Sequence, residues 1–219
     1  MTRISVKDQY YTLVNIFETT PEHQHRLIDI WQSLGPADER TGLVSVNAHL
    51  SHDGHSVISY IQWRDKASWE GILGDPGRQE RFKEVLTFAT FDSIHCEVVY
   101  TQRNPALGEP TVELSEDQDV FTVIEVARTR SRAQQQALLD AVTGPDAVLD
   151  ATPGYISHSV HRDFEGEAVV SYSQWQSEEA YRAFRADREA RGGQPALPDG
   201  VDVREYTLKI AYVTETTQI

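Results

Sequence analysis

The feature that most constrains the fold is an internal duplication. Residues 42–63 align without a gap with residues 154–175, so that each residue n matches residue n + 112. The identical pairs include Gly42 and Gly154, His49 and His161, Gly54 and Gly166, Ser59 and Ser171, Tyr60 and Tyr172, Gln62 and Gln174, and Trp63 and Trp175. A chain that repeats one supersecondary unit is expected to fold as two similar units that bury a shared core.

Each unit carries the pattern of a ferredoxin-like domain. Segments with period-two alternation predict strands, segments with apolar residues at helical spacing predict helices, and the dipeptides DG and EG predict hairpin turns. The order β-α-β-β-α-β predicts four antiparallel strands with two helices on one face. The predicted elements are, in matching pairs, strands at 11–19 and 121–129, helices at 21–34 and 131–144, a hairpin at 41–63 and 153–175, helices beginning at 65 and 177, and strands at 96–101 and 209–214.

The other face of each predicted sheet is bare and needs a partner. Because the second unit is supplied by the same chain, we expect the two sheets to pack together. The predicted fold is therefore α+β, with two tandem ferredoxin-like domains at 1–102 and 120–219 whose sheets form a pseudo-dimeric α/β barrel. Residues 103–119 contain Pro and acidic side chains and are predicted to be a linker. We expect a monomer with this internal pseudo-dimer, or a homodimer.

Composition excludes several classes of partner. The chain has 219 residues, a formal net charge of −14 and 39% hydrophobic residues. The negative charge argues against nucleic acid and anionic membranes as partners, since both require a basic surface. No apolar run approaches the roughly 20 residues that cross a bilayer, and no secretory signal is recognised, so a cytoplasmic location is expected. The single cysteine, Cys96, is interpreted as a buried apolar residue in a strand.

The repeated tryptophans and histidines are the first candidate site residues. Trp63 and Trp175 end a strand and directly precede a helix, so each is expected to lie between sheet and helix. They are either core packing or the wall of a pocket, and the pattern alone leaves both readings open. His49 and His161 hold matching positions and are candidates for proton transfer or, alternatively, structural residues.

No metal site is predicted. His158 and His161 are three residues apart on a strand, so their side chains point to opposite faces. The nucleophile elbow, the phosphate loop, the dinucleotide fingerprint and the zinc helix motif are absent from the sequence. Residues 191–200, rich in Gly and Pro, are interpreted either as a lid over the second pocket or as a long loop.

With these residues assembled, the chain resembles the antibiotic biosynthesis monooxygenase family. The shared pattern is TG or PG before a strand, then a His, a DG-type turn, and a strand ending in Tyr-x-Gln-Trp before a helix with an aromatic residue. The resemblance implies oxidation of a phenol-, anthrone- or quinone-like aromatic polyketide with O2, in the biosynthesis of a secondary metabolite. It implies no bound cofactor, with reduced flavin as a cosubstrate in some tandem members.

The resemblance also implies roles for particular residues. In the second half Trp175, Tyr181, Ser171 and His161 are the implied catalytic residues, and this half is favoured because Tyr181 matches the family tyrosine. Ser59 and Ser171 stand where quinone-forming members have Asn, and a Ser hydroxyl still donates one hydrogen bond. The implied substrate-contacting residues are Trp63, Ser59, Trp69, Asn15, His49 and Tyr155.

Other functions within the same fold remain open at this point. Haem-degrading relatives use a helical His, which residues 66–86 and 178–191 lack, and this argues against haem degradation. A polyketide cyclase shares the barrel but consumes no oxygen. A protein that binds a small aromatic molecule without turnover is the third alternative.

Overall fold

The computed structural model describes residues 2–33, 41–108, 111–191 and 200–215. The first half contains β2 (Tyr11–Glu18), α1 (Pro21–Ser33), β3 (Leu43–Ser51), β4 (Ser56–Trp63), α2 (Lys66–Gly71), α3 (Pro76–Val85) and β5 (Thr90–Arg103). The second half contains β7 (Phe121–Arg128), α4 (Arg132–Val142), α5 (Ala147–Asp150), β8 (Tyr155–Asp163), β9 (Ala168–Trp175), α6 (Glu178–Ala190) and β10 (Asp202–Glu215). Outside the repeat lie β1 (Thr2–Ile4), β6 (Val112–Leu114) and the short 3₁₀ helix η2 (Pro105–Leu107).

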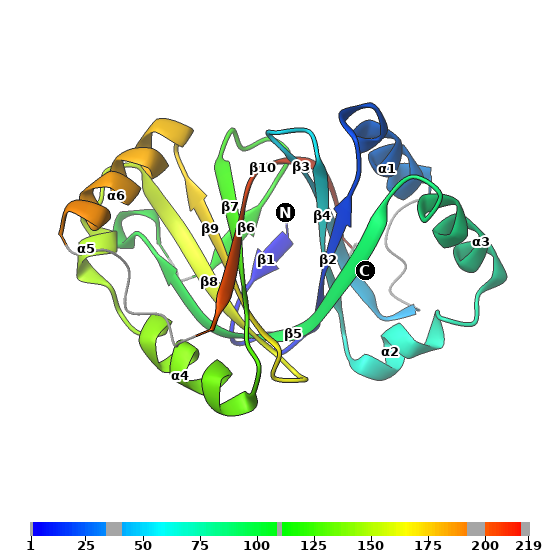
Figure 1. Cartoon of the computed structure of the whole chain (residues 1–219), viewed down its shortest axis with the longest axis horizontal. Coiled ribbons are helices and arrows are strands. Elements are labelled where there is room, and N and C mark those ends of the chain that lie inside the picture. Colours follow the sequence, from blue (N-terminus) through cyan, green and yellow to red (C-terminus); the bar gives the residue numbers. More distant parts are fainter. Residues whose placement is uncertain (1, 34–40, 109–110, 192–199, 216–219) are drawn as a thin grey trace.

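The two halves share one closed barrel (Figure 1). Its strands follow the order β10-β3-β4-β2-β5-β8-β9-β7, and all neighbours are antiparallel. The 14-residue strands β5 and β10 each pair with one strand of their own half and one of the other, β5 with β2 and β8, β10 with β7 and β3. The predicted fold, two ferredoxin-like domains joined as a pseudo-dimeric barrel, is confirmed.

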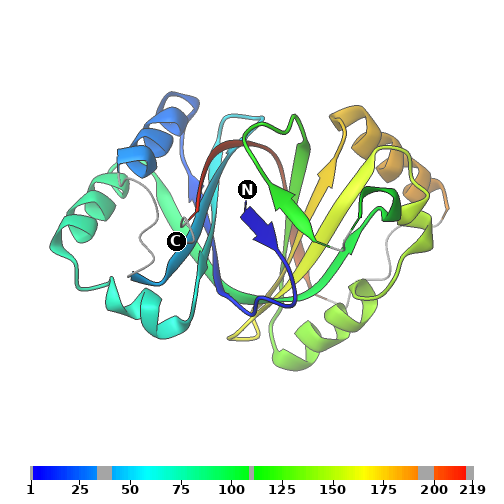
Figure 2. The same ribbon diagram turned by 180° about the vertical axis from the view of Figure 1, so that it is seen from behind.

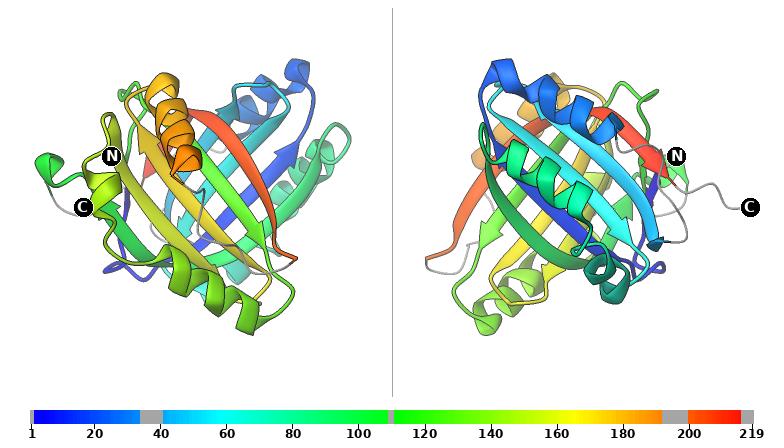
Figure 3. Two further views of the ribbon diagram at one scale, coloured as in Figure 1. Left: turned by 60° about the vertical axis from the view of Figure 1, so that its left-hand side comes forward. Right: turned by 90° about the vertical axis from the view of Figure 1, so that its right-hand side faces the viewer.

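Helices cover the outside of the barrel on two opposite flanks. Figure 1 and the reverse view in Figure 2 place α1 to α3 on one flank and α4 to α6 on the other, and Figure 3 shows each flank from its own side. The inner faces of the strands meet in a dry core that includes Val14, Ile58, Ile94, Ile124 and Val170. Each half-sheet is therefore buried twice, against the other half inside and against its helices outside.

Local sequence signals account for the helix starts and one tight approach. Asp65 and Ser177 cap α2 and α6 by accepting from the backbone N–H of Ser68 and Ala180. Gly42 and Gly154 have φ of +76° and +80°. A Cβ on either would overlap the side chain of Ser68 or Ala180, so the repeated glycine allows the strand entry to approach the helix N-terminus.

The repeated histidines and tyrosines meet across the barrel interior. Tyr60 Oη lies 2.9 Å from Nε2 of His161, and Tyr172 Oη lies 2.8 Å from Nε2 of His49. All four side chains are fully buried. We call these two contacts the cross-barrel pairs, because each joins a tyrosine of one half to a histidine of the other. They explain why both residues recur at the same offset in the sequence.

The repeated glutamines anchor a small additional sheet. Strands β1 and β6 pair antiparallel, and their Ile4, Val112 and Leu114 are fully buried in the barrel core. Gln62 Nε2 donates to the carbonyl of Arg3 in β1, and Gln174 Nε2 donates to the carbonyl of Glu113 in β6, both at 2.9 Å. Figures 1 and 2 show this sheet lying across the barrel between the two halves.

The structure departs from the sequence prediction in two of the predicted segments. The segment 103–119, predicted as a linker, begins with the last residue of β5 and contains β6, because Val112 and Leu114 bury their side chains in the core. The second helix of the first half is divided into α2 and α3. Residues 192–199, which make up most of the segment interpreted as a lid or loop, lie outside the described residues. No described helix is long and apolar enough to cross a membrane.

Candidate functional site

Each half has a cavity between the outer face of its half-sheet and its helices. The first-half cavity, of about 360 Å³, lies between β2, β4 and β5 and helices α1 to α3. The second-half cavity, of about 430 Å³, lies between β7, β8 and β9 and helices α4 to α6. Both volumes fall within the range of small-molecule sites. The repeat has therefore produced two pockets, whose linings differ.

The first-half cavity is walled mainly by apolar and aromatic side chains. Trp63 ends β4 and is 2% exposed, and Trp31 from α1 and Trp69 from α2 complete an aromatic wall. The other apolar lining residues are Leu13, Phe17, Leu27, Ile30, Ile61, Ile72, Leu73, Phe82, Val85 and Phe91. Such a lining favours a flat apolar ligand over a charged one.

A short polar network lies on the sheet side of this cavity. Asn15 is 6% exposed and lines the cavity from β2. Its Nδ2 donates to Ser59 Oγ at 3.1 Å, and its Oδ1 accepts from Ser93 Oγ at 2.6 Å. The network fixes the amide, because the strand register places Ser59 and Ser93 on either side of Asn15. Among the described residues, the second N–H of Asn15 has no acceptor, so it remains available to a ligand.

A tyrosine and a histidine form a second polar group in the same cavity. Tyr11 Oη lies 2.6 Å from Nδ1 of His95, and the edge of the His95 ring packs against Trp69. Burial lowers the pKa of His95 and raises that of Tyr11 to about 12, so that both are neutral near pH 7. His95 is half-buried and lines the cavity, which makes it a candidate proton acceptor.

The two repeated tryptophans differ in hydrogen bonding. The indole N–H of Trp175 donates to Ser173 Oγ at 3.1 Å. Ile61 stands at the position that matches Ser173, and the indole nitrogen of Trp63 is buried with no partner among the described residues. A buried N–H without an acceptor is costly, and this cost falls when a ligand supplies the acceptor.

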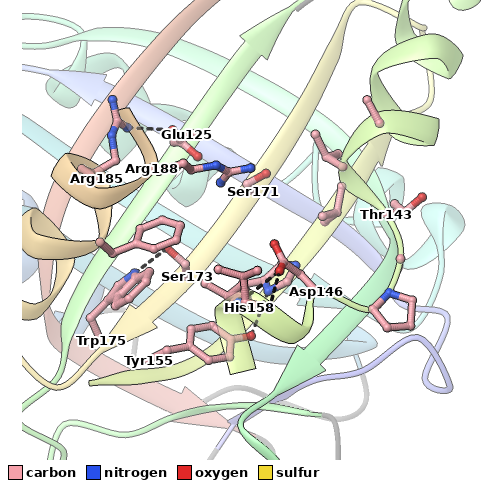
Figure 4. Close-up of a pocket in the computed structure, with 18 of the residues that line it drawn as sticks. Glu125, Thr143, Asp146, Tyr155, His158, Ser171, Ser173, Trp175, Arg185 and Arg188 are labelled. Atoms are coloured by element: carbon pink, nitrogen blue, oxygen red, sulfur yellow. Dashed lines mark hydrogen bonds and ion pairs between the residues drawn. The ribbon is translucent and has the colours of Figure 1, made fainter. Parts of the chain in front are cut away.

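The second-half cavity is more polar (Figure 4). Glu125 takes the register position opposite Ser171 that Asn15 takes opposite Ser59, and Glu205 lies beside it on β10. Arg185 from α6 bridges the two acids at 3.4 Å and 2.6 Å, and Tyr181 Oη donates to Glu205 at 2.6 Å. The polar groups that replace the Asn15 network are thus paired with one another.

A histidine and a tyrosine also meet in this second cavity. Tyr155 Oη donates to the carbonyl of Gln102 at 3.1 Å and lies 2.9 Å from Nδ1 of His158. Because the single phenolic hydrogen is used by Gln102, Nδ1 of His158 carries the hydrogen of the second contact. Burial lowers the pKa of His158 to about 4, so the ring is neutral and its Nε2 can accept a hydrogen bond.

The structure places most of the predicted site residues on the cavities. Trp175, Tyr181, Ser171 and Tyr155 line the second-half cavity. Trp63, Trp69 and Asn15 line the first, and Ser59 supports Asn15 from the neighbouring strand. Each repeated tryptophan thus forms part of a pocket wall and also packs in an aromatic cluster.

The assignment of His161 and His49 to a site needs correction. Both side chains point into the barrel, where strand alternation places them on the face opposite to the cavities, and neither lines a cavity. Burial lowers the pKa of each to about 4, which suits neutral partners of the buried tyrosines. They hold the two halves together and do not reach a ligand in either pocket.

Sequence reasoning missed His95, Tyr11, Ser93, Glu125 and Arg185. His95 was overlooked beside Cys96, although strand alternation puts the two on opposite faces. Glu125 carried a usable signal, since it is a charged residue in the middle of a largely apolar strand, at the offset n + 110 from Asn15. Among the described residues, no three His, Cys, Asp or Glu side chains are grouped as a metal site requires.

Comparison with known proteins identifies the family. The model of the family described as antibiotic biosynthesis monooxygenase matches residues 10–84 and again residues 120–196. The chain belongs to this family, with one copy of the domain in each half, and it is a monooxygenase of that family.

Particular relatives agree with this assignment. Tetracenomycin-F1 monooxygenase of Streptomyces glaucescens is 34% identical over 103 residues, which cover 46% of this chain and 92% of that protein. The crystal structure of an anthrone oxidase-like protein superposes with a TM-score of 0.81 at 27% identity, covering 98% of this chain and 96% of the other. A structure from Fusobacterium nucleatum, with a TM-score of 0.58 and 8% identity over 95% of this chain and 96% of its own, shares the fold.

Proposed function

We propose that the chain oxidises an aromatic, anthrone-like or phenolic polyketide intermediate with O2, and that the reaction takes place in the first-half cavity. The proposal rests on the Asn15 amide. Ser59 and Ser93 hold this amide on the sheet side of an aromatic cavity, and one of its two N–H groups has no acceptor among the described residues. The relatives include a tetracenomycin-F1 monooxygenase and an anthrone oxidase-like protein, which is consistent with this class of substrate.

The choice of cavity rests on which donors are available to a ligand. In the first half the second N–H of Asn15 has no acceptor among the described residues and the indole N–H of Trp63 has no partner. In the second half the indole N–H is used by Ser173, and Arg185 pairs with Glu125 and Glu205. The sequence favoured the second-half cavity because of Tyr181, whose hydroxyl is bonded to Glu205. The amide of Asn15 and the unpartnered indole of Trp63 support the first-half cavity instead.

The proposed roles follow from the chemistry of the substrate. An anthrone or phenol becomes a good electron donor when it loses a proton to form an enolate or phenolate. His95 accepts that proton at Nε2, in the tautomer whose Nδ1–H donates to Tyr11. The N–H of Asn15 stabilises the oxygen anion that forms, as preorganised donors do in other enzymes.

The substrate then supplies the electrons for O2. One electron passes from the enolate to O2, the radical pair combines to a hydroperoxide at the reacting carbon, and loss of water leaves a carbonyl. One O2 is consumed, one oxygen atom enters the product, the other leaves as water, and the CH2 of the substrate supplies both hydrogens. The aromatic walls keep bulk water from the radical pair. An assay with and without reduced flavin determines whether a cosubstrate is required.

The test is oxygen uptake by the purified full-length chain with a hydroxylated anthrone, followed by mass spectrometry in ¹⁸O2. The proposal predicts one O2 consumed per quinone formed and one ¹⁸O in the product. Cyclised product without oxygen uptake would indicate a cyclase. Binding of the anthrone without any product would indicate a binding protein, and either result would overturn the proposal.

The roles of individual residues are tested in the same assay. His95→Ala removes the proton acceptor, and the rate is expected to fall by about 100-fold or more near neutral pH, since general bases contribute on that order. The loss should shrink at high pH, where the substrate ionises without help. An equal loss at every pH would argue against His95 as the base.

A further inference from the structure

The second-half cavity differs enough from the first to bind a different ligand. Its apolar wall is a cluster of rings, with Trp175 4.8 Å from a tilted Phe184 ring and 5.5 Å from Tyr155, which it meets edge to face, between ring centroids. All three rings line the cavity (Figure 4). The cavity of about 430 Å³ accommodates a planar aromatic molecule.

The acidic side chains of this cavity already have partners within the protein. Glu125 is paired with Arg185, which also pairs with Glu205 outside the lining. The carboxylate of Asp146 caps α5 by accepting from the backbone N–H groups of Val148 and Leu149. Both acids of the lining are therefore held by hydrogen bonds or an ion pair within the protein.

Arg188 is different, because it lines the same cavity without a carboxylate partner among the described residues. It is half-buried, and its guanidinium lies 5.5 Å from the centre of the Phe184 ring. In Figure 4 its side chain runs from α6 toward Ser171 on β9. The stacked, unpaired guanidinium is a ready partner for a carboxylate, which it can bind through two parallel hydrogen bonds.

We propose that the second-half cavity binds a planar aromatic carboxylate, with Arg188 pairing with the carboxylate and the rings of Trp175 and Phe184 packing against the ligand ring. The hydroxyl of Ser171 lies on the same side of the cavity and donates to the carboxylate or to a ring oxygen. Nε2 of His158 accepts from a ring hydroxyl. This site is separate from the one proposed for oxidation, and the inference does not depend on that proposal.

Isothermal titration of the full-length chain tests the site with two matched probes. Anthraquinone-2-carboxylate carries the anion, and anthraquinone-2-carboxamide has nearly the same shape without the charge. Arg188→Gln is expected to weaken binding of the carboxylate by about 10- to 100-fold, the usual value of a charged hydrogen-bonded pair. Binding of the amide should stay unchanged, which also demonstrates that the variant is folded.

Two further variants test whether Arg188 is the side chain that binds the carboxylate. Arg188→Lys should recover part of the affinity, because the charge remains but the planar fork is lost. Arg78→Gln, on α3 at the first-half cavity, is the matched control and should bind the carboxylate as the wild type does. Unchanged carboxylate binding in Arg188→Gln, or a loss caused by Arg78→Gln instead, would overturn the proposal.

Discussion

The two cavities derive from one repeated unit, and their difference lies in a few side chains on matching strands. Asn15 in the first half is matched by Glu125 in the second, Ser93 by Glu205, and Ile61 by Ser173. In the first half these changes leave hydrogen-bond donors available in an aromatic pocket. In the second half they create a paired charge cluster and satisfy the tryptophan. The Tyr, Gln and Gly of the repeat are the same in both halves and maintain the barrel and the strand entries. The residues that line the two pockets can therefore differ without a change of fold.

The largest expected effect is that of Asn15→Ala on oxidation. Loss of a preorganised donor to an oxygen anion lowers turnover by about 100- to 1,000-fold. The matching change Glu125→Ala should leave the rate close to that of the wild type, because it touches only the second-half cavity. Steady-state oxygen uptake by both variants checks this, with circular dichroism to confirm folding. Equal losses in the two variants would remove the distinction between the cavities.

A large effect on stability is expected from pH. Burial lowers the pKa of His49, His161 and His158 to about 4, whereas an unfolded histidine titrates near 6.5. Well above pH 6.5 these three histidines are neutral in both states and contribute no pH dependence. Between about pH 6.5 and 4 the unfolded state binds more protons than the folded state. As the pH falls through this range, each histidine therefore lowers the free energy of unfolding by about 1.4 kcal/mol for each pH unit.

Urea unfolding between pH 8 and pH 5 measures this dependence. His158 has no counterpart in the first half, where Val46 holds the matching position. His158→Asn should therefore reduce the slope by up to about 1.4 kcal/mol per pH unit, which is the contribution of one histidine. A slope that is unaffected by this change would mean that His158 does not titrate as its burial indicates.

The cross-barrel pairs should respond equally to mutation, in contrast to the cavities. Tyr60→Phe and Tyr172→Phe each remove one buried hydrogen bond to a histidine and should each lower the free energy of unfolding by about 1–3 kcal/mol. Thermal or urea unfolding of the two single variants tests this symmetry. A large difference between them would show that the two halves also differ in the barrel interior.

The smallest expected effect comes from exchanging the residue beside each tryptophan. Ile61→Ser places a hydroxyl where Ser173 stands in the second half, so that Trp63 can bond within the protein. Turnover should fall by about 10-fold, the value of one modest hydrogen bond. Ser173→Ile frees Trp175 and should leave turnover unchanged. An undiminished rate in Ile61→Ser would indicate that the Trp63 N–H is not used by the substrate.

Much of the fold could be predicted because both copies of the repeat show the same order of strand and helix patterns. The repeat also indicates that the two halves of the chain fold alike. The strand and helix order followed from alternation in segments such as 11–19, and the pairing of sheets followed from their bare faces. Strands β1 and β6 could not be predicted, because three-residue strands carry little periodicity. Their place depends on Gln62 and Gln174, which donate to their backbone across long sequence distances.

The aromatic walls of the two cavities could be predicted from the sequence, but most of their polar groups could not. Trp63 and Trp175 precede a helix, which already places them between sheet and helix. His161 looked equally suited to a site, but strand alternation turns it into the barrel. His95 and Ser93 come from β5, and their approach to Tyr11 and Asn15 depends on the register between β2 and β5, which the sequence does not specify.

The central claim is that only the first-half tryptophan serves the oxidation. Its most direct test is oxygen uptake with a hydroxylated anthrone by Trp63→Phe and Trp175→Phe, measured side by side. Trp63→Phe should lower kcat/KM by about 10- to 100-fold through loss of the unpaired N–H, and Trp175→Phe should retain nearly the full rate. A loss confined to Trp175→Phe would contradict the account and return the oxidation to the second-half cavity.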